Sequence, residues 1–387
     1  MRFSDIPGQK ETKQQLVHMV QQNRLSHALL FLSREGCGSL SLALALAQYI
    51  VCEKTSGSKE AKPKPISLFG EEEDDVQKKI EPLIDSCGEC SGCKKASQLV
   101  HPDIHYSYPV IPKKAGEKPK SVDYVQQWRE FMQQQPYGNT YDWLQFINAE
   151  NKQGNITSEE CLDIIRKMNL KSFESEYKIL IMWMPEMLGK EGNKLLKLIE
   201  EPPPDTLFIL VAENESLLLP TIVSRTQLIK VPAFRPIDIE ASLELKEGID
   251  MDKAVKLSVL SEGNYREALQ QLQHSADDWD QLLKDWLNSI LKTGPAVQVK
   301  IIDEISKIGR EKQKQFIKYF THILQQSIRI QAGTPVVSQS TGISGFAAKL
   351  SRLCELSQLE AIVSELDKAA YYVERNANAK MLFHALT

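Results

Sequence analysis

Two short apolar runs, separated by a helix-like stretch, dominate the middle of the chain. Lys178 to Met184 (KILIMWM) and Leu207 to Ala212 (LFILVA) show no alternation of polar and apolar residues, as expected of strands that are buried on both faces. Between them, Lys190 to Glu201 has helical periodicity, and Pro202 to Pro204 end it. Strand, helix and strand joined by short connections predict a βαβ unit, and therefore a parallel sheet.

The N-terminal pattern predicts a third buried strand, followed by a glycine loop and an apolar helix. Arg24 to Phe31 (RLSHALLF) leads into the strand, Ser33 to Leu40 (SREGCGSL) forms the loop, and Ser41 to Ala47 (SLALALA) belongs to the helix. This order of elements is the context in which a nucleotide-binding P-loop occurs. A chance glycine turn before a core helix is the alternative.

The loop lacks groups that bind a nucleotide. In the full motif, G-x-x-x-x-G-K-[ST], the lysine reaches the β- and γ-phosphates and the last hydroxyl binds Mg²⁺. Here Ser33 replaces the first glycine, Ser39 stands at the lysine position and Leu40 at the hydroxyl position, while Gly36 and Gly38 preserve the turn. These three losses predict a P-loop fold that does not bind ATP productively.

The second acidic element of a P-loop ATPase is missing as well. The Walker B pattern ends an apolar strand with Asp-Glu, which position Mg²⁺ and water. If Lys178 to Met182 is that strand, Trp183 and Met184 stand at the acids, and neither side chain can coordinate a metal. Glu186 lies two residues further on and is a poor substitute. We therefore expect no ATP hydrolysis by this chain.

Four of the seven cysteines form a spaced set. Cys87, Cys90 and Cys93 follow the pattern C-x2-C-x2-C, and Cys52 lies upstream. Four thiolates suit a closed tetrahedral Zn²⁺ site with a structural role, because no position is left for a catalytic water. An iron–sulfur cluster and unligated cysteines are the alternatives. This spaced set is more typical of a metal site in a reducing cytoplasm than of disulfide bonds.

Composition bears on nucleic-acid binding, on the cellular compartment and on one mobile loop. The 387 residues carry a formal net charge of −4, so no global basic field indicates nucleic-acid binding, and any DNA contact must be local or made by partners. The N-terminus lacks the apolar core of a signal peptide, and no run of about 18 apolar residues occurs, so we expect a cytoplasmic protein without a membrane span. Residues 53–80 are rich in Lys, Pro, Ser and Glu, which is typical of a solvated, mobile loop.

Aromatic residues gather in a second unusual stretch, residues 104–154. Because basic residues lie nearby, these rings could stack on single-stranded nucleic acid. The apolar residues beside them favour a small packed helical insert instead. The rings belong to Trp128, Phe131, Tyr137, Tyr141, Trp143 and Phe146.

The C-terminal part is predicted to be helical. Pro232 to Pro236 marks a boundary, and short helices follow it up to residue 272. From Asp277 on, apolar residues recur at helical spacing, interrupted by a polar loop from Gly333 to Gly345. The predicted fold class is α/β plus all-α, with a core domain at 1–231, a small helical domain at 232–274 and a second helical domain at 275–387.

Several motifs resemble those of the bacterial DNA polymerase III clamp-loader subunits, which belong to the AAA+ superfamily. The quoted stretches are NKLLKLIEEPP, LPTIVSR, FSDIPGQ and the HPD at residues 101–103 after the cysteines. Thr226 stands where the family has a cysteine. The pattern is closest to the delta-prime family, which pairs a degenerate P-loop with an intact Ser-Arg. The resemblance implies an AAA+ core with a zinc module, a helical lid, and a helical collar that joins subunits.

The resemblance also implies a role. The chain would be an ATP-inert member of the ring that loads the sliding clamp onto primed DNA, with motor (gamma/tau) and delta subunits as partners. It would have no ATPase activity of its own, although it would be part of a DNA polymerase complex. Ser224 and Arg225 would act in trans as an arginine finger, and a surface arginine paired with a carboxylate is the alternative. Arg266 matches the sensor 2 arginine of the lid. A structural remnant of that site and a surface arginine satisfied by a carboxylate are the alternatives.

Two functions of other classes are weighed against this one. The first is an active AAA+ ATPase motor subunit of a clamp loader, against which Ser39, Leu40, Trp183 and Met184 argue. The second is a zinc-dependent nucleic-acid-binding module, which the acidic balance disfavours.

Overall fold

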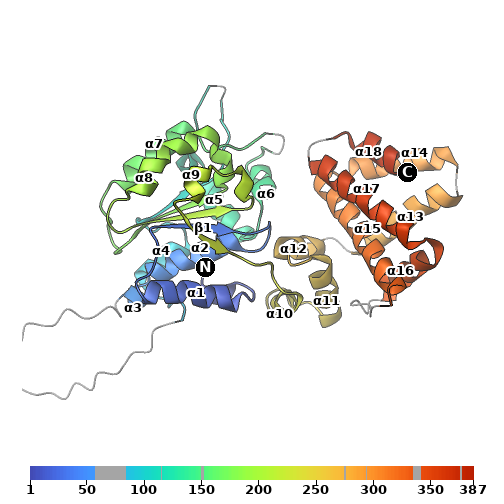
Figure 1. Cartoon of the computed structure of the whole chain (residues 1–387), viewed down its shortest axis with the longest axis horizontal. Helices are drawn as coiled ribbons and strands as arrows, with labels where there is room; N and C mark the ends of the chain where they lie inside the picture. Colours follow the sequence, from blue (N-terminus) through green and yellow to red (C-terminus); the bar gives the residue numbers. More distant parts are fainter. Residues whose placement is uncertain are drawn as a thin grey trace, which may run out of the picture. The chain divides into compact units, whose positions relative to one another are not determined.

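The computed structural model describes residues 1–56, 84–114, 116–149, 152–273, 276–292, 294–333, 341–374 and 377–387 (Figure 1). The chain forms two compact units, of which one comprises Met1–Asp238 with Gly263–Arg266 and the other comprises Ile239–Glu262 with Glu267–Thr387. The finer division into core, lid and collar domains stays a prediction. Most of the predicted loop at 53–80 lies outside the described residues. None of the helices described combines the length and the apolarity that crossing a membrane requires.

A five-stranded parallel sheet forms the centre of the first unit. Its order is β2-β3-β4-β1-β5, and every neighbouring pair runs parallel. All residues of β3 and β4 are buried, as their apolar runs predict. Because β1 lies between β4 and β5, the glycine loop that follows β1 lies at the carboxyl edge of the sheet and not beside an outer strand. Open α/β sheets bind ligands at this edge. The strands are β1 (Ala28–Leu32), β2 (Ile104–Ser107), β3 (Lys178–Trp183), β4 (Thr206–Ala212) and β5 (Gln227–Lys230).

Helices cover both faces of this sheet (Figure 1). Alternate residues of β1, β3 and β4 form one apolar core with α7, η3, α8 and α9, and α2 packs on the other face. The predicted α/β fold class is confirmed for this unit. Its helices are η1 (Phe3–Asp5), α1 (Lys10–Gln21), α2 (Ser39–Ile50), α3 (Glu53–Ser56), α4 (Ser91–Ser97), η2 (Ser121–Tyr124), α5 (Val125–Gln134), α6 (Thr140–Phe146), α7 (Ser158–Met168), η3 (Pro185–Leu195), α8 (Leu196–Glu200), η4 (Glu215–Leu217) and α9 (Pro220–Val223).

The helix predicted at 190–201, between the two central strands, is longer than the α-helix that the structure shows there. Residues 185–195 form the 3₁₀ segment η3 with non-helical backbone angles at Gly189, and only α8, five residues long, is α-helical. Glycine disfavours the helix interior because it has the most backbone freedom to lose, and a second glycine follows at Gly192. The sequence analysis also missed β5, an edge strand in which only Ile229 is buried.

The described residues that follow β2, within 108–149, form a packed insert, as predicted. Trp128, Phe131 and Trp143 are almost completely buried, and the Trp128 ring stacks on Tyr108 at a centroid distance of 4.0 Å. These buried rings have no free face for a base, so the alternative of nucleic-acid stacking does not hold for them. The beginning of the stretch, β2, belongs to the central sheet and not to the insert.

The second unit is all helical, which confirms the other half of the predicted fold class. A core of apolar side chains joins its last six helices and includes Trp286, Phe316, Phe320 and Phe383. The predicted polar loop from Gly333 to Gly345 is partly wrong, because α16 already begins at Thr341, and residues 334–340 lie outside the described part. The helices that follow residue 235 are α10 (Pro236–Glu247), α11 (Met251–Leu260), α12 (Tyr265–Gln273), α13 (Ala276–Lys292), α14 (Pro295–Lys307), α15 (Arg310–Gln331), α16 (Thr341–Leu353), α17 (Leu356–Glu374) and α18 (Ala379–Leu386).

Candidate functional site

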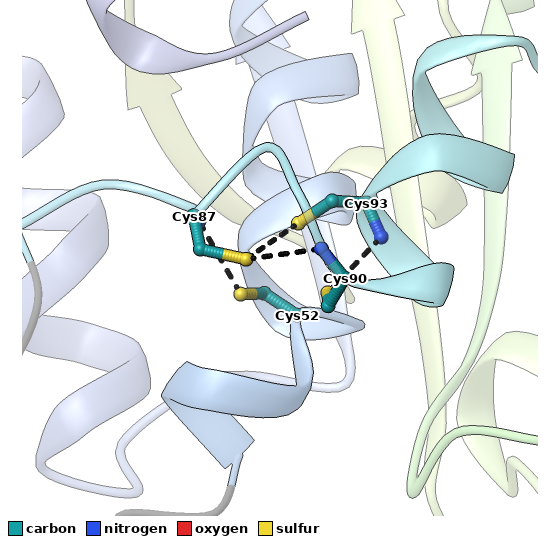
Figure 2. Close-up of side chains that lie close together, drawn as sticks. All are labelled: Cys52, Cys87, Cys90 and Cys93. Atoms are coloured by element: carbon teal, nitrogen blue, oxygen red, sulfur yellow. Dashed lines mark hydrogen bonds between the residues drawn. The ribbon is translucent and has the colours of Figure 1, made fainter.

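The four predicted metal ligands lie together in the first unit. Cys52 follows the end of α2, Cys87 and Cys90 lie in the loop before α4, and Cys93 lies in the first turn of α4 (Figure 2). Their four sulfur atoms are all within 4.8 Å of one another, so the group could hold a metal ion. The local reason is the fold of the C-x2-C-x2-C run, in which Gly88 has a positive φ of 74° and a helix starts at Ser91.

The geometry fits a tetrahedral thiolate site. Zinc–sulfur bonds of about 2.3 Å place neighbouring sulfurs about 3.8 Å apart in a tetrahedron, and Cys87 Sγ lies 3.8 Å from Cys93 Sγ. Backbone amides of the loop point at the sulfurs, because the amides of Cys87, Cys90 and Cys93 each donate to the preceding cysteine of the set at 3.4 Å. A bound metal ion would supply a cross-link between the end of α2 and this loop.

The protonation of the thiols is set by burial and by these amides. Burial opposes ionisation of Cys87, yet the amide donors of Cys90 and Glu89 lower its pKa to about 6. Burial raises the pKa of the Cys93 thiol well above its usual range. Metal binding would therefore release a proton from the more deeply buried sulfur, as is usual for thiolate sites.

His101, which follows the cysteines, is not among the grouped ligands. Its Nδ1 atom accepts a hydrogen bond from the amide of Asp103 at 3.1 Å. The Asp103 carboxylate in turn accepts the amides of Glu174 and Ser175 at 2.7 and 2.8 Å. The His-Pro-Asp motif therefore connects the end of the cysteine module to the loop that leads into β3.

The glycine loop has the shape of a phosphate loop without its chemistry. It joins β1 to α2, and both Gly36 and Gly38 have positive φ angles, 69° and 79°. Ser33 and Ser39, which replace the first glycine and the lysine of the motif, are both buried, and their hydroxyl groups are hydrogen-bonded to each other at 2.9 Å. Leu40 is buried as well. No cation or magnesium-binding hydroxyl is present at these positions.

Protein atoms also cover the two glycines. A Cβ atom on Gly36 would lie 1.8 Å from Oδ1 of Asn264, and one on Gly38 would lie 2.8 Å from the Phe234 ring and 3.3 Å from Tyr137. The amide of Tyr265 donates to the Gly36 carbonyl at 3.1 Å. The space that glycines leave for the close approach of phosphate is therefore filled from within this unit.

The end of β3 has become part of the apolar core. Trp183, at the first Walker B acid position, is buried and its ring lies 5.4 Å from that of Trp128 in the insert. Met184 is buried too. Glu186 serves a structural purpose, because its Oε1 atom accepts the amides of Glu213 and Asn214 at 2.6 and 2.8 Å. The insert therefore packs where a metal-binding acid would otherwise stand.

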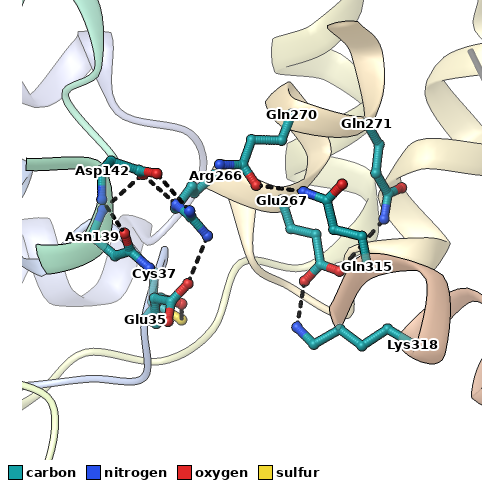
Figure 3. Close-up of polar contacts among 10 residues, drawn as sticks. All are labelled: Glu35, Cys37, Asn139, Asp142, Arg266, Glu267, Gln270, Gln271, Gln315 and Lys318. Atoms are coloured by element: carbon teal, nitrogen blue, oxygen red, sulfur yellow. Dashed lines mark hydrogen bonds and ion pairs between the residues drawn. The ribbon is translucent and has the colours of Figure 1, made fainter. Parts of the chain in front are cut away.

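Arg266 is held by two carboxylates (Figure 3). Its side chain is only 5% exposed. Nη2 donates to Asp142 Oδ1 at 2.6 Å, Nε also donates to the Asp142 carboxylate, and Nη1 donates to Glu35 at 2.9 Å. Glu35 lies in the glycine loop and Asp142 in the first turn of α6, and all three residues belong to the first unit.

Arg225 lies at the surface directly after α9. Nη1 donates to the Thr221 carbonyl at 2.9 Å and to Ser224 Oγ at 3.2 Å, and Nη2 forms an ion pair with Glu200. About a third of the Arg225 side chain is exposed, 36%. In the isolated chain the guanidinium is thus paired with a carboxylate, which is the arrangement that the alternative interpretation of Arg225 expects.

Sequence reasoning missed the carboxylates that hold the two arginines. Asp142 could have been placed at a helix start, since Asn139 and Asp142 form a capping box. No local signal connects it to Arg266, which is 124 positions away. Glu200 belongs to the Glu-Glu-Pro-Pro stretch of the family resemblance, but its pairing with Arg225 is likewise not encoded in any spacing.

Comparison with known proteins finds relatives among the subunits of one replication enzyme. The chain is 26% identical over 228 residues to the DNA polymerase III delta′ subunit of Bacillus subtilis, which covers 59% of this chain and 49% of the relative. It is 22% identical to the Escherichia coli delta′ subunit, covering 91% of this chain and 84% of the relative. A gamma/tau subunit of Mycobacterium bovis is 24% identical, covering 67% and 34%.

Among solved structures, a DNA polymerase III gamma subunit-related protein of Thermotoga maritima matches with a TM-score of 0.37 and 13% identity. The match covers 96% of this chain and 97% of the other chain. The resemblance to delta-prime subunits is confirmed by the curated relatives. The family model described as "DNA polymerase III, delta subunit" matches residues 8–65 and 66–235. Since these residues make up more than half of the chain, the protein belongs to this clamp-loader family of DNA polymerase III.

Proposed function

We propose that the chain is an ATP-inert subunit of the DNA polymerase III clamp loader. The observation that carries the proposal is the hydrogen bond between Ser33 and Ser39 at 2.9 Å inside the buried glycine loop. The Ser39 hydroxyl, bonded to Ser33, replaces the lysine ammonium that would bind phosphate. The chain keeps the architecture of a nucleotide-binding domain but offers the nucleotide no charge at this position.

The rival function, an active motor subunit, needs groups that the chain lacks. Hydrolysis requires a bound Mg²⁺ and an oriented water, whereas Leu40, Trp183 and Met184 are buried and apolar. Relatives include both delta′ and gamma/tau subunits, so overall similarity does not separate the two functions. The residues at the phosphate loop and at the end of β3 favour the inert one.

Arg225 is proposed to act in trans on the nucleotide of a neighbouring motor subunit. A finger that served this chain's own site would have no substrate there. The guanidinium is partly exposed and is presented by the short helix α9, with Ser224 Oγ beside it. Assembly would exchange the carboxylate of Glu200 for the phosphate of the neighbour, and both are bound by the same planar fork.

The proposal names further components of the assembly. The partners are motor (gamma/tau) and delta subunits in the cytoplasm, and the sliding clamp and primed DNA are reached through the complex. Zinc held by Cys52, Cys87, Cys90 and Cys93 has a structural role, because four thiolates complete the shell.

The test begins with an ATP titration of the isolated chain by calorimetry, with a motor subunit as the positive control. We expect no binding by the chain and no turnover. The second step is co-purification with motor and delta subunits, followed by mass analysis of the complex. ATP turnover by the purified chain above that of a mock preparation would refute the inert role, and failure to enter the complex would refute the clamp-loader role.

A further inference from the structure

Arg266 carries a buried positive charge beside the glycine loop. Its guanidinium is 5% exposed, and one of its bonds goes to Glu35 within that loop. A buried charge is costly unless it is paired, so some anion has to be present at this point for the fold to be stable. The chemical group that supplies this anion therefore indicates which kind of ligand fits beside Arg266.

The anion that occupies the fork of Arg266 is supplied by the insert, in addition to Glu35 of the glycine loop. Asp142 is 7% exposed on its side chain and occupies the fork formed by Nε and Nη2 of Arg266. The planar fork of arginine binds carboxylate and phosphate oxygens with the same paired geometry. The carboxylate of Asp142 thus takes the position that an oxyanion bound at this arginine would take.

The surroundings close the site over this pair. Ser41 Oγ donates to the carbonyl of Pro136 in the insert at 2.9 Å. The Tyr137 ring packs against the rings of Phe234 and Tyr265, with centroid distances of 6.1 and 4.8 Å. The insert therefore contacts the head of α2 through a hydrogen bond. It contacts Phe234 and Tyr265 through an aromatic cluster, and Arg266 through an ion pair at Asp142.

We infer that Asp142 is a built-in oxyanion ligand that closes a latent anion-binding site at Arg266. The insert provides the carboxylate that pairs with the buried arginine. It also covers the glycine loop, through Tyr137. Removing the Asp142 carboxylate opens a position that a small oxyanion such as inorganic phosphate fills. The inference deepens the ATP-inert part of the proposed function, which rests separately on Ser39, Leu40, Trp183 and Met184.

The experiment compares the thermal unfolding of the full chain with that of Asp142→Ala, Arg266→Ala and the double variant. Each is measured in inorganic phosphate and in sodium chloride of the same ionic strength. Asp123→Ala is the matched control, because Asp123 also caps a helix start by accepting a backbone amide, at 2.8 Å from Lys120, but is exposed and holds no arginine. Phosphate stabilises most proteins a little by exclusion from the surface, and the control measures that background.

Asp142→Ala should lower the Tm of the transition on the order of 5–10 °C in chloride. Phosphate should restore at least half of this loss, whereas its effect on the parent chain, on Asp123→Ala and on the double variant should stay at the background. A phosphate effect on Asp142→Ala equal to that on the parent chain would overturn the inference, as would an equal effect on the double variant. If Asp142→Ala does not fold, Asp142→Asn, which keeps the shape but removes the charge, is judged by the same criteria. Either failure leaves the ATP titration of the parent chain, and so the inert role, untouched.

Discussion

At the scale of single residues, the proposed function gives Arg225 a second partner besides the one it has in this chain. It pairs with Glu200 in the isolated chain, yet its guanidinium suits a phosphate of a neighbouring subunit equally well. In a reconstituted clamp loader, Arg225→Ala should lower the rate of ATP hydrolysis about tenfold or more, because the charge on the transferring phosphoryl group loses its stabilisation. Arg225→Lys should also be impaired, since lysine lacks the planar fork.

The control for this prediction is Arg235→Ala. Arg235 is also an exposed arginine paired with a carboxylate, Asp238, at 2.7 Å. Its loss should leave hydrolysis unchanged, and Glu200→Gln should not lower the rate because it only releases Arg225. A complex with Arg225→Ala that assembles, hydrolyses ATP and loads clamps at the parent rate would show that the arginine is no finger.

The phosphate loop gives a second prediction at the scale of residues. The double change Ser39→Lys and Leu40→Thr should not create ATPase activity, because Trp183 and Met184 still provide no carboxylate for Mg²⁺. It should also lower the Tm, since position 39 is only 8% exposed and burying a lysine ammonium there is costly. Turnover assays and thermal unfolding check both statements, and measurable turnover by the double variant would contradict the first.

Among the elements, the cysteine module depends on all four sulfurs. Cys93→Ser should abolish metal binding, which we expect at one Zn²⁺ per chain, and should lower the Tm, because a three-thiolate site binds zinc far more weakly. Elemental analysis of gently purified protein and thermal unfolding measure the two effects. Cys161→Ser is the control, since Cys161 is equally buried but stands alone. Iron with sulfide, or no metal in the parent chain, would contradict the zinc assignment.

In the second unit, helix α15 contains a histidine that should make stability depend on pH. His322 is buried, its Nε2 atom lacks a hydrogen-bond partner among the described residues, and burial, aided by the charge of Arg329, lowers its pKa to about 4. An unfolded histidine has a pKa of about 6.5. Between these values only the unfolded state binds the proton, so stability falls as the pH falls, by at most about 3 kcal/mol.

Hydrogen exchange of the α15 amides at pH 7 and pH 5 checks this prediction. The parent chain should lose protection at the lower pH, and His322→Leu should lose much less. His384→Leu, a change at an exposed histidine of α18, serves as the control and should behave like the parent. If His322→Leu shows the full loss of protection, the pH dependence comes from other groups.

At the scale of the whole molecule, the first unit is discontinuous in sequence. Residues 263–266 belong to it although the chain between 239 and 262 does not. A chain that ends at residue 238 lacks Arg266 and therefore leaves Asp142 and Glu35 without their cation. Hydrogen exchange in α6 and in the glycine loop should be faster in such a truncation than in one that ends at residue 273. Equal protection in the two would mean that the buried ion pair contributes little to this unit.

The sequence by itself determined whatever depends on neighbours along the chain. Apolar runs marked β3 and β4, cysteine spacing marked the module whose sulfurs gather in space, and missing motif residues marked the altered phosphate loop. Burial periodicity and turn chemistry act over a few residues, so they can be read without a fold. The exceptions were η3, where two glycines weakened a helical pattern, and β5, a short edge strand with one buried residue.

Only the tertiary structure decided which distant residues meet. It paired Asp142 with Arg266 and Glu200 with Arg225, and it joined the hydroxyls of Ser33 and Ser39. It also placed the insert, whose rings are packed against Trp183 at the end of β3. Such contacts arise because folding brings together segments far apart in sequence, and a charge or a ring finds its partner by burial and geometry, for which a linear pattern contains no signal.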